Sequence, residues 1–209
     1  TPQHISSVES IFLCRPNTSN VMVMFAGCGA QMIPFYELSG GKAKITGVEL
    51  NPLVKELSVT TPVLDSFRLA EFYALPNVDL KIMEGRSFLV GSNEKFDAIF
   101  VGSKASTNVQ LTGHSRKYLD TVEAFELYLD HLTDDGVMLF NHQPLGDVIA
   151  TLKRVYEERK MPPFDQCAMV LRSGNMNDLM ISAKPFSRED VERLVKADTP
   201  DKSQIDYAP

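Results

Sequence analysis

Two glycines and an acid about twenty residues later are the residues of this chain best suited to chemistry. Gly27-Cys28-Gly29 directly follows an apolar run, and Glu49 ends the next one. Glycines at such a turn let the backbone approach a ligand, and the amides of a following helix point at it. A carboxylate at the end of the second strand accepts hydrogen bonds from adjacent ribose hydroxyls. The pattern predicts a nucleoside site; the alternatives are a tight strand–helix turn and a solvated glutamate.

The nucleoside expected here is not a dinucleotide. The GxGxxG pattern is incomplete because Met32 stands where the third glycine belongs. That glycine allows a helix to pack closely on the strand beside a pyrophosphate. An adenosyl sulfonium nucleoside has no pyrophosphate, so the pattern favours such a ligand over NAD. Glu84-Gly85 follows the third predicted strand. There Glu84 either accepts a hydrogen bond from an adenine amino group or begins a helix.

The elements that must position these residues alternate between strand and helix. Apolar runs and period-two patterns predict strands at 21–26, 44–49, 78–83, 96–101, 137–141, 167–171 and 179–183. Helices are predicted at 31–39, around 148–156 and around 191–195. Another begins at Asn51-Pro52 and breaks at Pro62, where a further helix starts and runs toward Leu75. A last one runs from Val122 and ends at Asp135-Gly136. The order predicts a doubly wound, Rossmann-like α/β fold of the seven-stranded methyltransferase type. Its sheet is mostly parallel, with a C-terminal antiparallel hairpin turning at Ser173-Gly174-Asn175.

The length and composition fit one globular domain. The 209 residues are 44% hydrophobic and 23% charged, which excludes a largely disordered chain. We expect a nucleoside-binding domain over residues 21–197. Residues 1–20 form an N-terminal extension with a remnant strand at Val8–Cys14, and residues 198–209 form a C-terminal tail. The formal net charge of −6 argues against nucleic acid as a partner, because nucleic-acid sites are basic.

Neither a metal nor a membrane span is predicted. The three cysteines have no CxxC spacing, and the four histidines have no HxH or HExxH spacing. The longest uncharged run, 16–36, is broken by prolines, polar residues and the glycine turn, so it is a poor membrane helix. The start lacks the pattern of a signal peptide. We therefore expect a cytoplasmic domain, cut from a longer protein.

With these motifs in this order, the sequence resembles the spermidine/spermine synthase (aminopropyltransferase) family of the class I S-adenosylmethionine methyltransferase-like superfamily. The matching segments are Val21–Gly29, Gly47–Pro52, Pro76–Leu89, Lys95–Ile99 and Asp134–Val137. Two further segments, Tyr118–Phe125 and Lys184–Asp190, resemble a divergent bacterial branch in which this domain often accompanies membrane-spanning segments.

The resemblance implies a site for S-adenosylmethionine, its decarboxylated form or methylthioadenosine, with the nucleoside acting as donor substrate. Residues 27–31 would face the sulfonium end, Glu49 the ribose, and Glu84-Gly85 the adenine. The full set implied is Ala26, Gly27, Cys28, Gly29, Gln31, Glu49, Leu50, Glu84 and Gly85. The resemblance also implies a polyamine acceptor, a homodimer and a place at the cytoplasmic face of the membrane if the domain belongs to a membrane protein.

One departure from the family concerns catalysis itself. The family's enzymes carry an acidic pair after the fourth strand, where this chain reads Gly102-Ser103-Lys104-Ala105. A carboxylate there helps to deprotonate the attacking amine, whereas Lys104 repels a cationic acceptor. Ser103 and Asp120 are the remaining catalytic candidates, although Asp120 also suits a helix N-terminus.

Three functions therefore stay open for this chain. The first is an aminopropyltransferase-like transferase, and the second is a methyltransferase acting on an unidentified acceptor. The third is a nucleoside-sensing domain without turnover, which the missing acidic pair favours.

Overall fold

An eight-stranded sheet runs through the centre of the molecule, flanked by helices on both faces. The computed structural model describes residues 7–27, 29, 31–61, 68–102, 118–141, 145–173, 176–197 and 204–209. Its strands are β1 (Asn20–Met24), β2 (Lys44–Glu49), β3 (Val78–Ile82), β4 (Phe96–Val101), β5 (Leu132–Asn141), β6 (Ala168–Ser173), β7 (Met176–Ser182) and β8 (Gln204–Tyr207). They are ordered β3-β2-β1-β4-β5-β7-β6-β8. The strands from β3 to β5 in this order pair in parallel, and the pairs β5–β7, β7–β6 and β6–β8 are antiparallel. The predicted fold class is confirmed.

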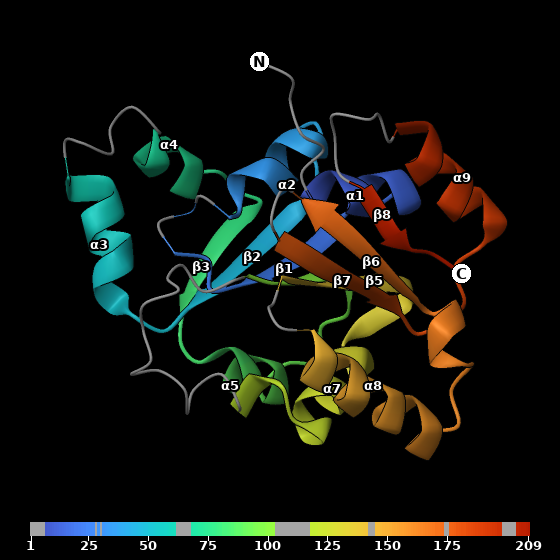
Figure 1. Ribbon diagram of the computed structural model, residues 1–209. Helices are drawn as coiled ribbons and strands as arrows, with labels where there is room; N and C mark the ends of the chain where they lie inside the picture. The colour runs from blue at the N-terminus through green and yellow to red at the C-terminus, as the bar shows by residue number, and fades with distance from the viewer. Residues whose placement is uncertain are drawn as a thin grey trace.

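Two layers of helices enclose the sheet (Figure 1). One layer holds α1 (Ser7–Cys14), α2 (Ile33–Leu38) and α9 (Arg188–Ala197), and the other holds α5 (Gly85–Val90), α7 (Val122–Asp130) and α8 (Gly146–Glu158). The short helices α3 (Pro52–Thr60) and α4 (Leu69–Tyr73) lie toward the β3 side. The apolar side chains form two clusters, one on each face of the sheet. The helices thus cover both faces of the sheet.

Strand β1 is buried on both faces, as its unbroken apolar run predicts. Val21 and Val23 belong to the cluster under α1, α2 and α9, whereas Met22 and Met24 belong to the cluster over α5, α7 and α8. None of the four is more than 2% exposed. A strand with helices on both sides has no polar face, and its position in the middle of the sheet follows from this pattern.

Met32, which replaces the third glycine of the dinucleotide pattern, packs over a glycine in the neighbouring strand instead. A Cβ atom built on Gly47 would lie 2.4 Å from the Met32 sulfur and 2.9 Å from the Ala26 Cβ. Met32 itself is fully buried at the start of α2. The close approach of α2 to the sheet therefore depends on the absence of a side chain in β2 rather than in the helix.

The predicted remnant strand at Val8–Cys14 is wrong, because this segment forms helix α1. Its buried apolar residues Val8, Ile11 and Cys14 recur every three positions, which is a helical spacing. The amide of Arg15 continues the helical pattern by donating to the Ile11 carbonyl at 2.7 Å. The extension is therefore part of the helical layer that covers the sheet.

Two further boundaries differ from the prediction. Helix α7 ends at Asp130, and β5 begins at Leu132, so Asp135-Gly136 lies inside the strand at an irregularity between Phe96 and Ala98 of β4. A Cβ on Gly136 would lie 2.8 Å from the Phe96 carbonyl oxygen, which explains the glycine at this close approach. Residues 204–207 of the predicted tail form β8, an eighth strand paired with β6. The break predicted at Pro62 and the hairpin turn at Gly174-Asn175 lie outside the described residues.

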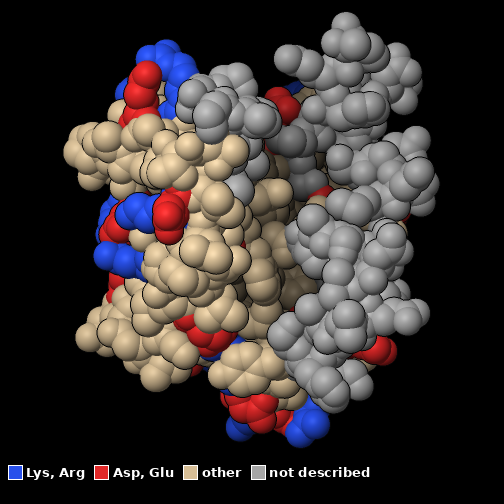
Figure 2. Space-filling model, turned by 90° about the vertical axis from the view of Figure 1, so that its left-hand side faces the viewer, with Lys and Arg blue, Asp and Glu red and all other residues tan. Residues whose placement is uncertain are grey.

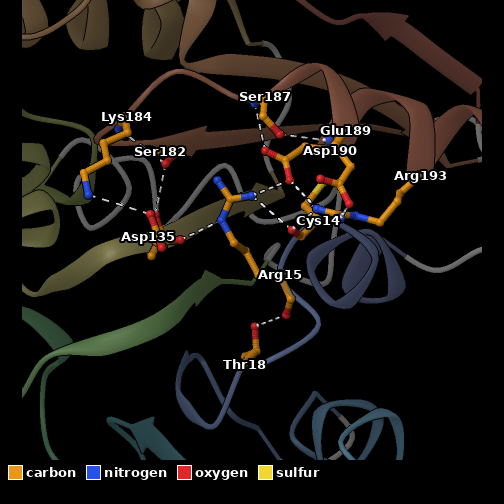
Figure 3. Close-up of polar contacts among 11 residues, drawn as sticks. Cys14, Arg15, Thr18, Asp135, Ser182, Lys184, Ser187, Glu189, Asp190 and Arg193 are labelled. Atoms are coloured by element: carbon orange, nitrogen blue, oxygen red, sulfur yellow. Dashed lines mark hydrogen bonds and ion pairs between the residues drawn. The ribbon is translucent and has the colours of Figure 1, made fainter.

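A buried ionic cluster joins α1, α9 and β5 (Figure 3). Asp190, only 4% exposed, pairs through one oxygen with Arg15 at 2.8 Å and with Arg193 at 2.6 Å. Its other oxygen accepts from the Ser187 amide at 2.8 Å. Arg15 also donates to the carbonyls of Asp135, at 2.7 Å, and Cys14, at 3.0 Å. One carboxylate thus fixes two helices and the start of β5 relative to one another.

Hydrogen bonding and charge keep this carboxylate ionised. Burial alone would raise the pKa of Asp190, but the bonds from Ser187 and the pairing with Arg15 outweigh it and hold the pKa below the ordinary value. A depressed folded-state pKa contributes stability that is present above the unfolded-state pKa and is lost as the pH falls through the folded-state pKa. The cluster therefore stabilises the fold at neutral pH and weakens in acid.

We expect Asp190→Asn to lower the free energy of unfolding by about 3 kcal/mol at pH 7, because two arginines lose their shared counter-charge. The difference from wild type should shrink as the pH falls below about 4, where the unfolded chain binds a proton at Asp190 before the folded carboxylate does. Urea unfolding at pH 7 and pH 3 measures both effects. The exposed Asp134→Asn is the control and should change stability by less than about 1 kcal/mol. A difference that stays constant with pH would contradict the account.

We expect Gly47→Ala to destabilise the fold by about 1–3 kcal/mol, because its methyl group would overlap the buried Met32 side chain. Gly146→Ala is the matched control, since a Cβ at that position meets no atom within 4 Å. Thermal unfolding of the two variants should show a lower midpoint for Gly47→Ala alone. Equal midpoints would show that α2 does not depend on the gap at Gly47.

Candidate functional site

The carboxyl ends of β3, β2, β1 and β4 lie side by side at one edge of the sheet. Glu49 of β2 pairs with Ile82 of β3, and Met24 of β1 lies between Val48 and Val101. The chain order reverses between β1 and β4, and ligands of open α/β sheets bind at such a reversal. Figure 2 shows this side of the molecule, where uncharged side chains form most of the centre and charged ones gather mainly at the margins.

Glu49 is held in place by two backbone amides. Its Oε2 accepts from the Gly27 amide at 3.1 Å, and its Oε1 accepts from the Asn51 amide at 3.0 Å. Because a carboxylate has about four lone-pair sites, each oxygen keeps acceptor capacity for a further donor. The side chain is therefore oriented by the turn after β1 and by the start of α3, and it can still accept two hydroxyl groups.

The start of α3 shows why the segment after Glu49 has a fixed shape. Asn51 caps the helix, its side-chain oxygen accepting from the Leu53 amide at 3.1 Å, and Pro52 occupies the first turn. Both features were predicted from the sequence and are confirmed. The cap turns the chain immediately after β2, so that the Asn51 amide points back to Glu49.

The two glycines of the turn have different surroundings. Both have left-handed backbones, with φ of 53° at Gly27 and 84° at Gly29. A Cβ at Gly29 would lie 2.9 Å from the Tyr73 hydroxyl and 3.3 Å from Leu69. The absence of a side chain at Gly29 therefore lets these residues of helix α4 pack closely against the turn. Among the described residues other than its chain neighbours, none would come closer to a Cβ at Gly27 than the Phe25 carbonyl, at 3.9 Å. Gly27 is therefore the position where the backbone stays open to a ligand.

Exposed apolar residues follow Glu49 in the chain and lie at the end of the neighbouring strand β3. Leu50 is 68% exposed, and Ile82 and Met83, which follow one another at the end of β3, are 39% and 38% exposed. The Met83 amide donates to the Glu49 carbonyl at 3.0 Å, which ties the two strand ends together. Exposed apolar groups beside an acceptor for hydroxyls suit a flat aromatic base attached to a ribose.

Glu84, the second acid predicted for the site, caps helix α5. Its carboxylate accepts from the amides of Arg86 at 3.0 Å and Ser87 at 2.8 Å, and from the Ser87 hydroxyl at 3.1 Å. These contacts use most of its acceptor capacity, so the geometry favours the helix-start alternative. Gly85 packs against Met24, whose side chain a Cβ would approach within 3.0 Å. A contact of either residue with adenine stays a prediction.

A contact that the sequence does not reveal joins α5 to the segment before α7. Arg86 lies over the Tyr118 ring, 4.1 Å from its centroid, and donates to the Tyr118 carbonyl at 2.8 Å. The buried Tyr128 hydroxyl is influenced by the charges of Arg86, Asp120 and Glu84, and burial is the main cause of its raised pKa. Asp120 lies two residues after Tyr118, in the segment that this contact ties to α5. Arg86 follows Glu84-Gly85 directly, but no spacing rule indicates its partner.

The other predicted site residues are described only in part. Ala26 is buried, and its amide donates to the Val48 carbonyl at 3.2 Å, so it fixes the turn between β1 and β2. Gln31 is exposed just before α2. Gly102 follows β4, with its amide 3.4 Å from the Met24 carbonyl. Cys28 and Ser103 lie outside the described residues.

Two hollows in the described part of the molecule lie away from this edge. One of about 400 Å³ is formed by the end of α8 and residues 161–165, and one of about 300 Å³ includes Arg15, Asp97 and Thr133. In the second, Asp97 already accepts from the Ser19 amide and from Thr133, at 2.9 and 3.0 Å. Neither hollow contains a predicted site residue.

The described thiols are not suited to chemistry. Cys14 and Cys167 are both buried, and burial raises the pKa of Cys14 to about 12 and that of Cys167 to about 11. No three His, Cys, Asp or Glu side chains within the described ranges are placed to hold a metal ion. In the same part of the chain, no helix is both long and apolar enough to cross a membrane.

Comparison with known proteins places this geometry in a structural class. No family model matches the sequence, and no curated protein does. Among solved structures, spermidine synthase from Thermotoga maritima matches with a TM-score of 0.62 and 20% identity, covering 89% of this chain and 60% of that protein. Human methyltransferase-like protein 13 in complex with SAH matches with a TM-score of 0.60 and 15% identity, covering 90% of this chain and 83% of that protein.

The chain has a spermidine synthase-like, class I methyltransferase fold. A spermidine synthase structure in complex with the transition state analogue AdoDATO matches with a TM-score of 0.60 and 20% identity over 90% of this chain. The chain spans about 60% of the length of the synthase chains in these two structures. In this methyltransferase fold, β1 and β2 carry the Gly27 turn and Glu49 side by side, so the two strongest sequence features fall together.

We expect Gly29→Ala to lower the free energy of unfolding by roughly 2–4 kcal/mol, because the alanine would combine a strained backbone with a clash against Tyr73. Gly27→Ala carries the strain without the clash and should cost about 1 kcal/mol. Thermal unfolding separates the two. If Gly27→Ala proved the more destabilising, the open space assigned to Gly27 would be filled by packing instead.

Proposed function

We propose that this chain binds an adenosyl nucleoside, either S-adenosylmethionine, its decarboxylated form or methylthioadenosine, at the carboxyl edge of β1 and β2. The observation that carries the proposal is the Glu49 carboxylate, which two backbone amides orient beside the open position at Gly27. A carboxylate held in this way is ready to accept the two ribose hydroxyls without reorganising.

The charges and shapes around Glu49 support an adenosyl ligand over a phosphorylated one. The negative charge of Glu49 repels a ribose phosphate. The exposed side chains of Leu50 and Met83 offer apolar contact to a purine ring. The solved structures of the same fold include one in complex with SAH and one in complex with AdoDATO, which is consistent with a nucleoside donor here.

We further propose that the domain acts as a transferase whose acceptor is not a polyamine. The segment after β4 reads Gly102-Ser103-Lys104-Ala105, which contains a cation and no acid. An amine must lose its proton before it attacks a sulfonium carbon, and a lysine neither accepts that proton readily nor attracts a cationic acceptor. Asp120, two residues after the Tyr118 that contacts Arg86 of α5, is the candidate acid among the described residues, and Ser103 is the candidate in the segment itself.

Nucleoside sensing without turnover is the second candidate. It is favoured by the same feature, because a site that keeps Glu49 but has no acid after β4 retains binding while losing a catalytic group. The two candidates share one nucleoside site and differ only in whether the bound nucleoside is consumed.

We expect Glu49→Ala to weaken the binding of methylthioadenosine by about 10- to 100-fold, because two hydrogen bonds to a charged acceptor are lost. Isothermal titration calorimetry with methylthioadenosine, S-adenosylmethionine and its decarboxylated form measures the effect. Glu56→Ala, which removes an exposed acid on α3, is the matched control and should leave affinity unchanged. Full affinity in Glu49→Ala would refute its role at the ribose, and no binding of any nucleoside by the wild type would refute the site.

Turnover is tested separately with decarboxylated S-adenosylmethionine and putrescine. We expect no protein-dependent release of methylthioadenosine, because the acid that would help to deprotonate the amine is missing. Release would contradict our interpretation of Gly102–Ala105. Incubation of the protein and labelled S-adenosylmethionine with a small-molecule cell extract then separates the two candidates. Protein-dependent transfer of label supports a transferase, and tight binding without transfer supports sensing.

A further inference from the structure

Phe25 has an unusual backbone conformation at the edge where the nucleoside site lies. It directly follows β1 and adopts a left-handed conformation with φ of 57°. Its side chain is 47% exposed, although the four preceding residues of β1 are almost fully buried. A left-handed backbone is unfavourable for a bulky residue, because its Cβ crowds the neighbouring carbonyl. A large apolar side chain is therefore held in a strained position and left open to solvent.

Of the other left-handed, non-glycine residues in the described ranges, Lys160 has a local explanation that Phe25 lacks. Lys160 follows the end of α8, where its amide donates to Glu157 and the Met161 amide donates to Tyr156, as in a common helix-terminating motif. Arg68 immediately precedes the first turn of α4. Phe25 terminates no helix. Strain without a local structural cause is typical of functional positions.

The position of Phe25 in the sheet points to one part of a bound nucleoside. β1 lies between β2, which ends at Glu49, and β4, which is followed by Gly102. With the ribose at Glu49, the sulfur end of an adenosyl nucleoside extends from β2 toward the reversal between β1 and β4. Phe25 follows the strand over which that end would pass, two residues before the open position at Gly27.

We propose that Phe25 is a specificity-determining residue whose ring covers the sulfur end of the bound nucleoside; this rests on the nucleoside site proposed above. Aromatic rings make favourable contacts with thioether sulfur, and they attract cations such as a sulfonium. The ring also makes this end of the site apolar, which suits the donor sulfur. Contact with the ligand would account both for the exposed ring and for the strained backbone that holds it there.

Phe25→Gly tests the proposal without endangering the fold, because glycine adopts the left-handed conformation freely. We expect its thermal midpoint to rise by up to roughly 4 °C as the strain is relieved. Its affinity for methylthioadenosine should fall by about three- to tenfold, whereas its affinity for adenosine, which lacks the sulfur, should be unchanged. Calorimetric titration of both ligands gives the comparison.

Lys160→Gly is the matched control, since it relieves the same kind of backbone strain at the far end of α8. It should raise the thermal midpoint and leave both affinities unchanged. Unchanged methylthioadenosine affinity in Phe25→Gly would overturn the proposal. An equal loss for both ligands would overturn the assignment to the sulfur end. If the wild type binds neither ligand, the nucleoside site itself is refuted, and this proposal is refuted with it.

Discussion

The hydrogen bond from the Gly27 amide to the Glu49 carboxylate joins the ends of two adjacent parallel strands, and the candidate site depends on it. The bond exists because β1 and β2 pair in a register that ends both strands at the same edge. The Asn51 amide completes the arrangement from the other side, and the cap of α3 fixes that amide. An acceptor at the surface is thus made rigid by backbone groups, whose positions the sheet determines.

The sequence predicts these features because they follow from local chemistry. A continuous apolar run gives β1, the segment Lys44–Glu49 gives β2 with the predicted bounds, and Asn51-Pro52 starts α3 where a cap and a first-turn proline belong. Parallel strands connected by helices must place their carboxyl ends together, so Gly27 and Glu49 meet without any long-range information. Glu84 was placed correctly at the edge, but which of two uses its carboxylate serves depends on the geometry of α5.

The features that the sequence does not reveal depend on contacts between distant segments. Val8–Cys14 is short enough to fit either a strand or a helix, and its packing in the helical layer decides between them. β8 lies in a short polar segment without a strong strand pattern, and it forms because β6 offers an unpaired edge. The contact between Arg86 and Tyr118 joins residues that are far apart in the chain, and the pairing of Arg15 with Asp190 does so over a still longer separation. No spacing rule connects such pairs.

Two positions near the glycine turn carry large side chains where a smaller residue would fit the turn more easily, and they differ in how the fold accommodates them. Met32 is buried, and the gap at Gly47 receives it, so its replacement of a glycine is balanced within the core. Phe25 is neither buried nor placed at a helix end, and its backbone remains in an unfavourable region. Packing therefore explains the large side chain at Met32 but not the one at Phe25. A ligand that contacts the ring would supply the missing interaction, because it would bury the apolar surface that the fold leaves exposed.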